Sequence, residues 1–300
     1  MSSKSHRTGK IVILLSIALC IASFFPVFDE YGIYVFILGA IMLVAGIVLA
    51  FVDTNYNRHI AKLDAAKQER EEARQQREMA RERHRLRIAQ TIETVNAIPD
   101  YEIDIAHKPV RRNTGFVPPD FSNITPKGNY SDIVVFDIET TGLKSGTDRI
   151  IELSAIRFLD RQAVAKFHTY INPDRPIPPE STDINGITDD MVVDSPKAGQ
   201  IIESFDNFVG SSILVAHNLK FDLGFVYYAG SKVMDTKRKY IDTLEQSQRL
   251  LKKPDDVDNH KLSTLCDYFG ITLAQAHQSI YDAYATGELF FRLVDMVQDN

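Results

Sequence analysis

The chain has 300 residues, 44% of them hydrophobic and 25% charged, which is enough for one or two domains with a substantial core. Its net charge of −6 argues against binding of nucleic acid through overall charge. The two cysteines, Cys20 in an apolar N-terminal stretch and Cys266 near the C-terminus, are not expected to form a disulfide, and reduced thiols fit the cytosol.

The first 52 residues predict a transmembrane helical hairpin. Residues 11–28 and residues 33–52 carry no charge, and the segment Asp29-Glu30-Tyr31-Gly32 separates them. Twenty helical residues rise about 30 Å, the thickness of the hydrocarbon core of a bilayer. The alternative is a secretory signal peptide followed by one span, but the residues after Leu19 form no good cleavage site. We therefore expect this segment to lie in a lipid bilayer.

The flanking charges predict the orientation of this hairpin. Lys and Arg precede the first span and follow the second, whereas the connection carries only acids. Both ends are therefore expected in the cytoplasm, with the rest of the chain on the cytoplasmic side of the inner membrane as part of a multi-pass protein. The basic residues are Lys4, Arg7, Lys10, Arg58 and Lys62.

Residues 53–95 predict a long charged cytoplasmic helix. From Lys67 to Arg87 there is no Gly or Pro, and Glu and Arg recur at helical spacing. The lack of a sustained apolar seam favours a solvated spacer over a coiled coil, although association of copies through this helix or the hairpin stays open. Arg81, Arg83, Arg85 and Arg87 either meet anionic lipid or nucleic acid or form a solvated face.

Residues 96–130 contain five prolines with no clear period and predict a linker. Residues 131–300 then alternate strand and helix patterns. Strands are expected at 133–136, 150–158, 163–171, 213–215 and near Ile241, and helices at 197–208, 221–228, 261–269 and 281–297. This order predicts an α/β domain with a mixed sheet flanked by helices. We expect a fragment starting near residue 125 to be soluble.

Three separated motifs carry acids next to apolar runs. Asp137 and Glu139 end the run that begins at Val134 and, two apart on a strand, share one face. Asp222 follows a second run, and His277 precedes Asp282 by five residues. Two carboxylates forced together repel unless a cation lies between them, and hard oxygen ligands suit Mg²⁺ or Mn²⁺. Four acids and one histidine are what two-metal hydrolysis of a phosphodiester needs.

At these motifs the chain resembles the DnaQ-like exonucleases, the DEDDh branch of the ribonuclease H-like superfamily. The resemblance covers roughly residues 130–298 and includes stretches such as Asp148–Glu152 and Ile184–Thr188. It implies a five-stranded ribonuclease H-like sheet, two divalent metal ions and release of nucleoside 5′-monophosphates from a 3′ end. Gln278 stands where the DEDDy branch has its tyrosine. Asn185 stands where many relatives have histidine, and we interpret it as a turn residue.

The resemblance also implies a role for each motif residue. Asp137, Glu139 and Asp282 would hold one metal ion, and Asp222 would assist at a second ion that Asp137 bridges. His277 would be the general base, because an imidazole titrates near neutral pH. The candidate substrate-binding residues are Thr140, Thr141 and Leu143 at the terminal nucleotide, and Asn218, Lys220 and Lys261.

His217 is the rival general base. Its place at the end of an apolar run favours a structural hydrogen bond instead.

The choice of substrate stays open at this stage. Residues 131–300 carry 17 Lys and Arg against 26 Asp and Glu, so metal ions and local basic groups must hold the phosphates. Selection of RNA needs contacts to the 2′-hydroxyl, and no residue in the sequence indicates such contacts. We favour single-stranded DNA with a free 3′ end. A 3′-5′ exoribonuclease and a catalytically weak membrane tether that binds nucleic acid are the alternatives.

Overall fold

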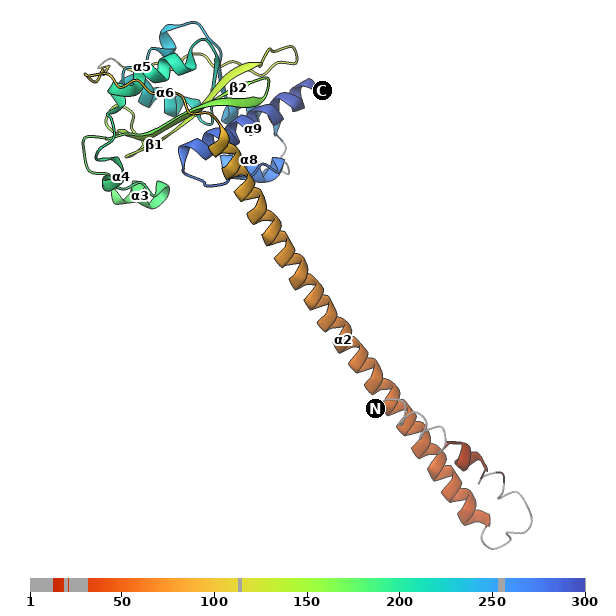
Figure 1. Ribbon diagram of the computed structural model, residues 1–300. Helices are drawn as coiled ribbons and strands as arrows, with labels where there is room; N and C mark the ends of the chain where they lie inside the picture. The colour runs from red at the N-terminus through yellow and green to blue at the C-terminus, as the bar shows by residue number, and fades with distance from the viewer. Residues whose placement is uncertain (1–12, 19–20, 22–31, 113–114, 253–256, 300) are drawn as a thin grey trace. The chain divides into compact units, whose positions relative to one another are not determined.

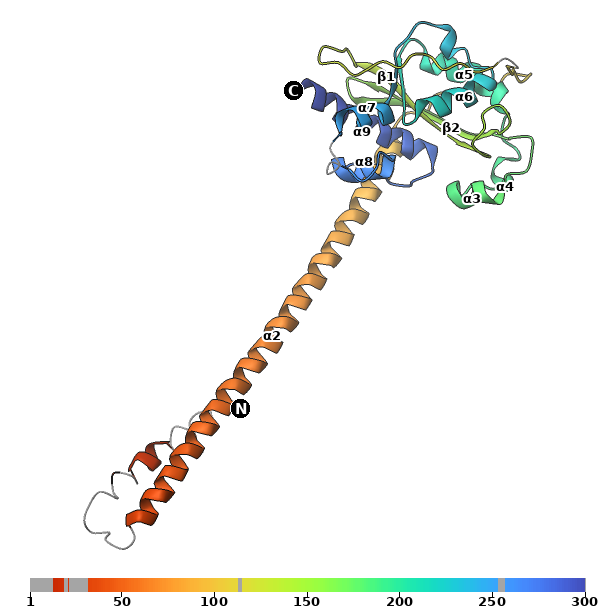
Figure 2. The same cartoon turned by 180° about the vertical axis from the view of Figure 1, so that it is seen from behind.

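The computed structural model describes residues 13–18, 21, 32–112, 115–252 and 257–299. The chain forms two compact units, Met1–Arg83 and His84–Asn300. Figure 1 and Figure 2 show the ribbon from opposite sides. The first unit contains the apolar N-terminal residues and most of the charged helix, and the second contains all the motif residues.

One helix, α2, runs without a break from Gly32 to Ala97. No proline interrupts it, and Pro99 follows its end, where the residue before a proline is driven out of the helical region. The second predicted span and the predicted charged helix are thus one element. The most apolar window of its stretch Ile37–Ala97 has a mean hydropathy of 2.4, so by length and composition this helix could cross a membrane.

The first predicted span lies largely outside the described residues. Residues 13–18 and residue 21 are helical, whereas the acidic connection at 29–31 is not described. The described part of the chain therefore contains one candidate span, and the two-helix hairpin stays a prediction.

The second unit is built on a five-stranded mixed sheet of order β3-β2-β1-β4-β5. The pairs β1–β2 and β2–β3 are antiparallel, and the pairs β1–β4 and β4–β5 are parallel. The strands are β1 (Asp132–Thr140), β2 (Ile150–Leu159), β3 (Gln162–Tyr170), β4 (Ile213–Ala216) and β5 (Tyr240–Asp242). The predicted five-stranded mixed sheet is confirmed.

The main helices cover both faces of this sheet. Figure 1 shows α5 and α6 on one side of the strands and α8 and α9 on the other. These helices confirm the predicted ones. They are α5 (Ala198–Val209), α6 (Leu219–Tyr228), α8 (Leu262–Phe269) and α9 (Ser279–Gln298).

The alternation of β1 decides which face each of its side chains meets. Val134 and Phe136 join the core with α5 and α6, whereas Val135 joins the core with α9. Asp137 and Glu139 continue the row of Val135. Both acids therefore lie on the face that α9 covers.

Four short helical elements were not expected from the sequence. They are too short to show a clear apolar period, and two of them have a recognisable first turn. Proline takes the first helical position of α3, and the Asp242 side chain caps α7 by accepting a hydrogen bond from the Leu244 N–H at 2.9 Å. They are α3 (Pro179–Asn185), α4 (Asp189–Val192), the 3₁₀ turn η1 (Val233–Asp235) and α7 (Thr243–Leu250).

The residues of the predicted linker lie within the second unit, and several of them pack against its core. Ile98, Ile124 and Tyr130 are buried in the core under α9. The Tyr101 N–H donates to the carbonyl of Lys166 at 2.7 Å, so this part of the segment pairs with the outer edge of β3. The apolar residues between the prolines therefore belong to the domain. A fragment starting near residue 125 would lose part of this core, and His84, where the second unit begins, is the better start.

Candidate active site

The end of β1 brings the first two acids together. Asp137 and Glu139 lie two residues apart on the strand, opposite Ser154 and Glu152 of β2. On its other side β1 runs parallel to β4, so both strands end at the same edge of the sheet. Residues that follow β4 therefore reach the same place.

Asp222 comes from the first turn of α6, just after β4. Asn218 turns the chain with a φ of 68°, and its N–H donates to Asp242 Oδ1 at 3.0 Å. Asp222 is 3% exposed. Burial raises the pKa of Asp222 well above its ordinary value, although a backbone hydrogen bond at Ile138 lowers it. Such a carboxylate needs a counter-charge to be ionised at neutral pH.

The electrostatics of Asp137 show that the four motif acids meet. Burial raises the pKa of Asp137 well above its ordinary value, and Asp222, Asp282 and Glu139 raise it further. These neighbours come from α6, α9 and β1 itself. Three elements thus bring four carboxylates to one place.

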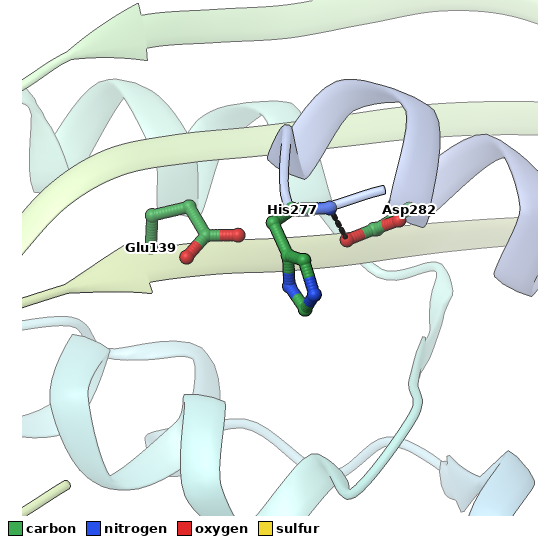
Figure 3. A group of neighbouring side chains, drawn as sticks. All are labelled: Glu139, His277 and Asp282. Carbon is green, nitrogen blue, oxygen red and sulfur yellow. Dashed lines mark hydrogen bonds between the residues drawn. The ribbon is translucent and has the colours of Figure 1, made fainter. Parts of the chain in front are cut away.

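The third motif lies at the start of α9, as Figure 3 shows. His277 has a φ of 64°, and its N–H donates to Asp282 Oδ2 at 3.0 Å. A ring nitrogen of His277 and one carboxylate oxygen each of Glu139 and Asp282 all lie within 4.8 Å of one another. His277 is exposed to solvent. The turn therefore places an accessible imidazole beside two acids.

The acids fit a divalent cation. Asp282 Oδ1 is buried and has no hydrogen-bond partner within the described ranges. Burial raises the pKa of Asp282 to about 7 and that of Glu139 to about 8, so neither is fully ionised at neutral pH without a counter-charge. A hard cation would bind the unpaired oxygen and offset the repulsion among the carboxylates.

Asn185 contributes more than the predicted turn. It does end α3 before Gly186, which has a φ of 72°. However, its Nδ2 also donates to Glu139 Oε2 at 3.3 Å, while its Oδ1 accepts from the Ile187 N–H at 3.0 Å. Asn185 is buried and orients Glu139. Its position where many relatives carry histidine was the signal for this contact.

Glu152 is a buried acid behind the site, and no role for it was expected from the sequence. It is 2% exposed, and its Oε2 accepts a hydrogen bond from the Ser279 N–H at 3.0 Å. Ser154 Oγ lies 2.6 Å from Ser279 Oγ and 2.9 Å from His168 Nδ1. This network ties β2 and β3 to the start of α9, two residues from His277. An acid inside an apolar strand was the signal that could have identified it.

His217 has the expected structural hydrogen bonds. Its Nδ1 lies 2.9 Å from Thr243 Oγ1, and its Nε2 donates to the carbonyl of His260 at 3.0 Å. Burial lowers the pKa of His217 to about 4. With both ring nitrogens engaged and the ring neutral at pH 7, His217 is a poor candidate for a base.

The predicted substrate-binding residues differ in exposure. Leu143 is 83% exposed, and Asn218, Lys220 and Lys261 are exposed as well. Thr141 is 3% exposed, and its Oγ1 accepts from the Arg149 N–H at 3.0 Å, so its hydroxyl holds the loop after β1. The Thr140 hydroxyl donates within the same loop, to the carbonyl of Gly142 at 2.6 Å.

Comparison with known proteins places the second unit among nucleases. A family model described as exonuclease matches residues 134–290, just over half of the chain. The DNA polymerase III PolC-type of Oceanobacillus iheyensis is 41% identical over 175 residues, which cover 57% of this chain and 12% of that protein. The protein of the same name from Bacillus subtilis is 42% identical over 164 residues, which cover 54% and 11%. The chain thus spans about an eighth of the length of these relatives.

Solved structures show a further likeness. Exonuclease X in complex with 5′ overhanging duplex DNA is 26% identical, with a TM-score of 0.45 over 54% of this chain and 91% of that one. E. coli Exonuclease I in complex with a dT13 oligonucleotide is 21% identical, with a TM-score of 0.48 over 56% and 42%.

Proposed function

This chain belongs to the exonuclease family, and from that premise we propose that it hydrolyses the terminal phosphodiester at the 3′ end of a nucleic acid and releases nucleoside 5′-monophosphates. The observation that carries the proposal is the meeting of four carboxylates and an accessible imidazole at the end of β1. A module that only binds nucleic acid has no need of this costly cluster, because phosphates are held by basic groups.

We assign two divalent ions, Mg²⁺ or Mn²⁺, to Asp137, Glu139, Asp222 and Asp282. When bound, such ions activate water and stabilise the charge that develops on the phosphate and the leaving oxygen. The protein positions the ligands beforehand. The His277 N–H holds Asp282, and the amide of Asn185 holds Glu139.

His277 is the residue to which we assign proton transfer. A ring nitrogen of His277 lies next to Glu139 and Asp282, where the attacking water would stand. The imidazole would take the proton from that water as general base. Solvent exposure lets the ring pass the proton on afterwards. The network from Glu152 to Ser279 fixes the turn that carries this ring.

We infer that single-stranded DNA is the preferred substrate. The relatives that match this domain are named DNA polymerases, which favours DNA over RNA. The exposed Leu143 is suited to pack against the terminal base, and Lys220 and Lys261 are suited to contact phosphates. We assign these three residues to binding of the substrate's 3′-terminal strand and not to the hydrolytic step.

We also propose that the enzyme is anchored in the cytoplasmic membrane. The apolar part of α2 exposes large side chains, among them Ile41, Val44 and Phe51. No other described element covers them in the first unit, which a bilayer would do. With residues 11–28 as a second span, the acidic connection would lie outside and the nuclease domain in the cytoplasm.

The test is a panel of 5′-labelled oligonucleotides of DNA and RNA, single- and double-stranded, incubated with Mg²⁺ or Mn²⁺. We expect stepwise shortening of single-stranded DNA from its 3′ end, with no loss of the label. Cutting of a closed circular strand would show an endonuclease, and faster digestion of RNA an exoribonuclease. If the protein binds these oligonucleotides but hydrolyses none of them with either ion, only the membrane tether that binds nucleic acid remains as a function.

A further inference from the structure

The charged part of α2 carries a face made of arginines. Arg70, Arg74, Arg77 and Arg81 follow one another at intervals of four, three and four residues. At 3.6 residues per turn these positions fall within an arc of roughly 60° and extend over about 16 Å of helix. Together with one alanine and one glutamate they line a single shallow depression on the helix surface.

Little in the described part of the chain neutralises this arginine face. All side chains from residue 61 to residue 87 are exposed. Arg74 pairs with Glu78 at 3.0 Å, but both side chains are solvated, and such pairs contribute little. Arg70, Arg77 and Arg81 have no hydrogen-bond or ion-pair partner among the described residues. The face is thus a band of charge available to an anionic partner.

We propose that the arginine face binds the phosphate backbone of the nucleic acid that the exonuclease domain degrades, an inference that rests on the proposed function. Seven of the eight basic residues from Lys67 to Arg87 are arginine, whose planar guanidinium matches phosphate oxygens in pairs. Residues 131–300 carry a net charge of −9, so the domain itself repels a polyanion. The helix supplies the long-range attraction that the domain lacks.

The position of the face makes anionic lipid a poorer occupant. If the predicted span ends at Val52, Arg70 follows it by 18 residues, or about 27 Å of helix. Electrostatic attraction to the headgroups is screened within about 8 Å at physiological salt.

A second copy of the helix is also a poorer occupant. Pairing through this face would set arginine against arginine, and the single alanine beside the arginines buries too little apolar surface to offset the repulsion.

The experiment measures binding apart from catalysis. Full-length protein with Asp137→Asn, without divalent ions, is titrated with a fluorescent single-stranded DNA of about 40 nucleotides at several salt concentrations. The test variant is R77Q/R81Q. The matched control is R83Q/R87Q, which removes the same charge at the same spacing from another side of α2. Glutamine forms helix nearly as well as arginine, so the fold is kept.

We expect R77Q/R81Q to bind at least fivefold more weakly, and its slope of log affinity against log salt to fall by about 1.4, since each phosphate contact of a single strand contributes about 0.7. In the quadruple variant R70Q/R74Q/R77Q/R81Q the slope should fall by about twice as much as in R77Q/R81Q. The control should change binding less than twofold.

Equal losses in R77Q/R81Q and R83Q/R87Q would overturn the proposal, because net charge alone would explain them. A change in sedimentation of the quadruple variant with unchanged DNA binding would assign the face to self-association instead. A change confined to vesicles of phosphatidylglycerol would assign it to lipid. The exonuclease itself is tested separately with Asp137 intact and Mn²⁺ present, so a lack of hydrolysis would refute the function and leave the binding result readable.

Discussion

Replacing Glu139 with glutamine should stabilise the metal-free second unit and weaken its dependence on pH. The pKa of Glu139 is raised from 4.5 to about 8, chiefly by burial and also by the charges of Asp282 and Glu152, while the hydrogen bond from Asn185 opposes the shift. An acid with a higher pKa in the folded state holds more protons there than in the unfolded state. The contribution of Glu139 to stability is therefore fully present below about pH 4.5 and is lost as the pH rises through 8.

The size of the effect follows from the shift. A pKa that rises from 4.5 to about 8 lowers the free energy of unfolding of the metal-free unit by about 5 kcal/mol above pH 8 and by about 3 kcal/mol at pH 7. Neutral Glu139→Gln removes most of this cost and keeps an oxygen that the Asn185 amide can reach. We therefore expect a gain of roughly 2–4 kcal/mol near pH 8 and little gain near pH 5.

Urea unfolding of the fragment from His84 to Asn300 measures this gain. Samples in chelator at about pH 5, 7 and 8.5 should show the wild type losing stability with rising pH, and Glu139→Gln losing less. Added Mg²⁺ should restore the wild type and not the variant. Glu203→Gln, an exposed change on α5, is the control and should follow the wild type. If wild-type stability stays constant from pH 5 to 8.5, the reasoning about buried, repelling carboxylates is wrong.

Four further predictions concern turnover and anchoring. His277→Ala should lower kcat by roughly two to four orders of magnitude with little change in metal affinity by calorimetry; a larger loss in folded His217→Ala would exchange the two roles. Glu152→Ala leaves the Ser279 N–H without its acceptor, so it should lower the free energy of unfolding by about 1–3 kcal/mol and also lower kcat; Glu152→Gln should largely restore both. A closed circular single strand should resist an enzyme that digests its linear form. The fragment from His84 should be soluble and active on short DNA, whereas the full-length protein should stay in the membrane fraction through a carbonate wash; its release would refute the anchor.

Local sequence was enough to select the residues to which we assign the chemistry. The side chains of a strand alternate, so Asp137 and Glu139 had to share a face wherever β1 lay in the sheet. The turn before α9 brings His277 to Asp282 by a backbone hydrogen bond five residues apart, a contact that spacing alone can suggest. The apolar and charged parts of α2 were likewise visible as composition, although their fusion into one helix was not.

Tertiary structure alone decided which distant groups surround those residues. Glu152 meets the start of α9 only because β1 and β2 pair in one register, and a shift of one residue would turn its side chain to the other face. Asn185 reaches Glu139 across 46 positions of sequence, which no local pattern encodes. The raised pKa values and the unpaired oxygen of Asp282 are collective as well, because they depend on how many carboxylates are buried together. Ile98, Ile124 and Tyr130 of the predicted linker make the same point for the fold. The prolines near them break helices and strands locally, but only the shape of the core decides that these three side chains are buried.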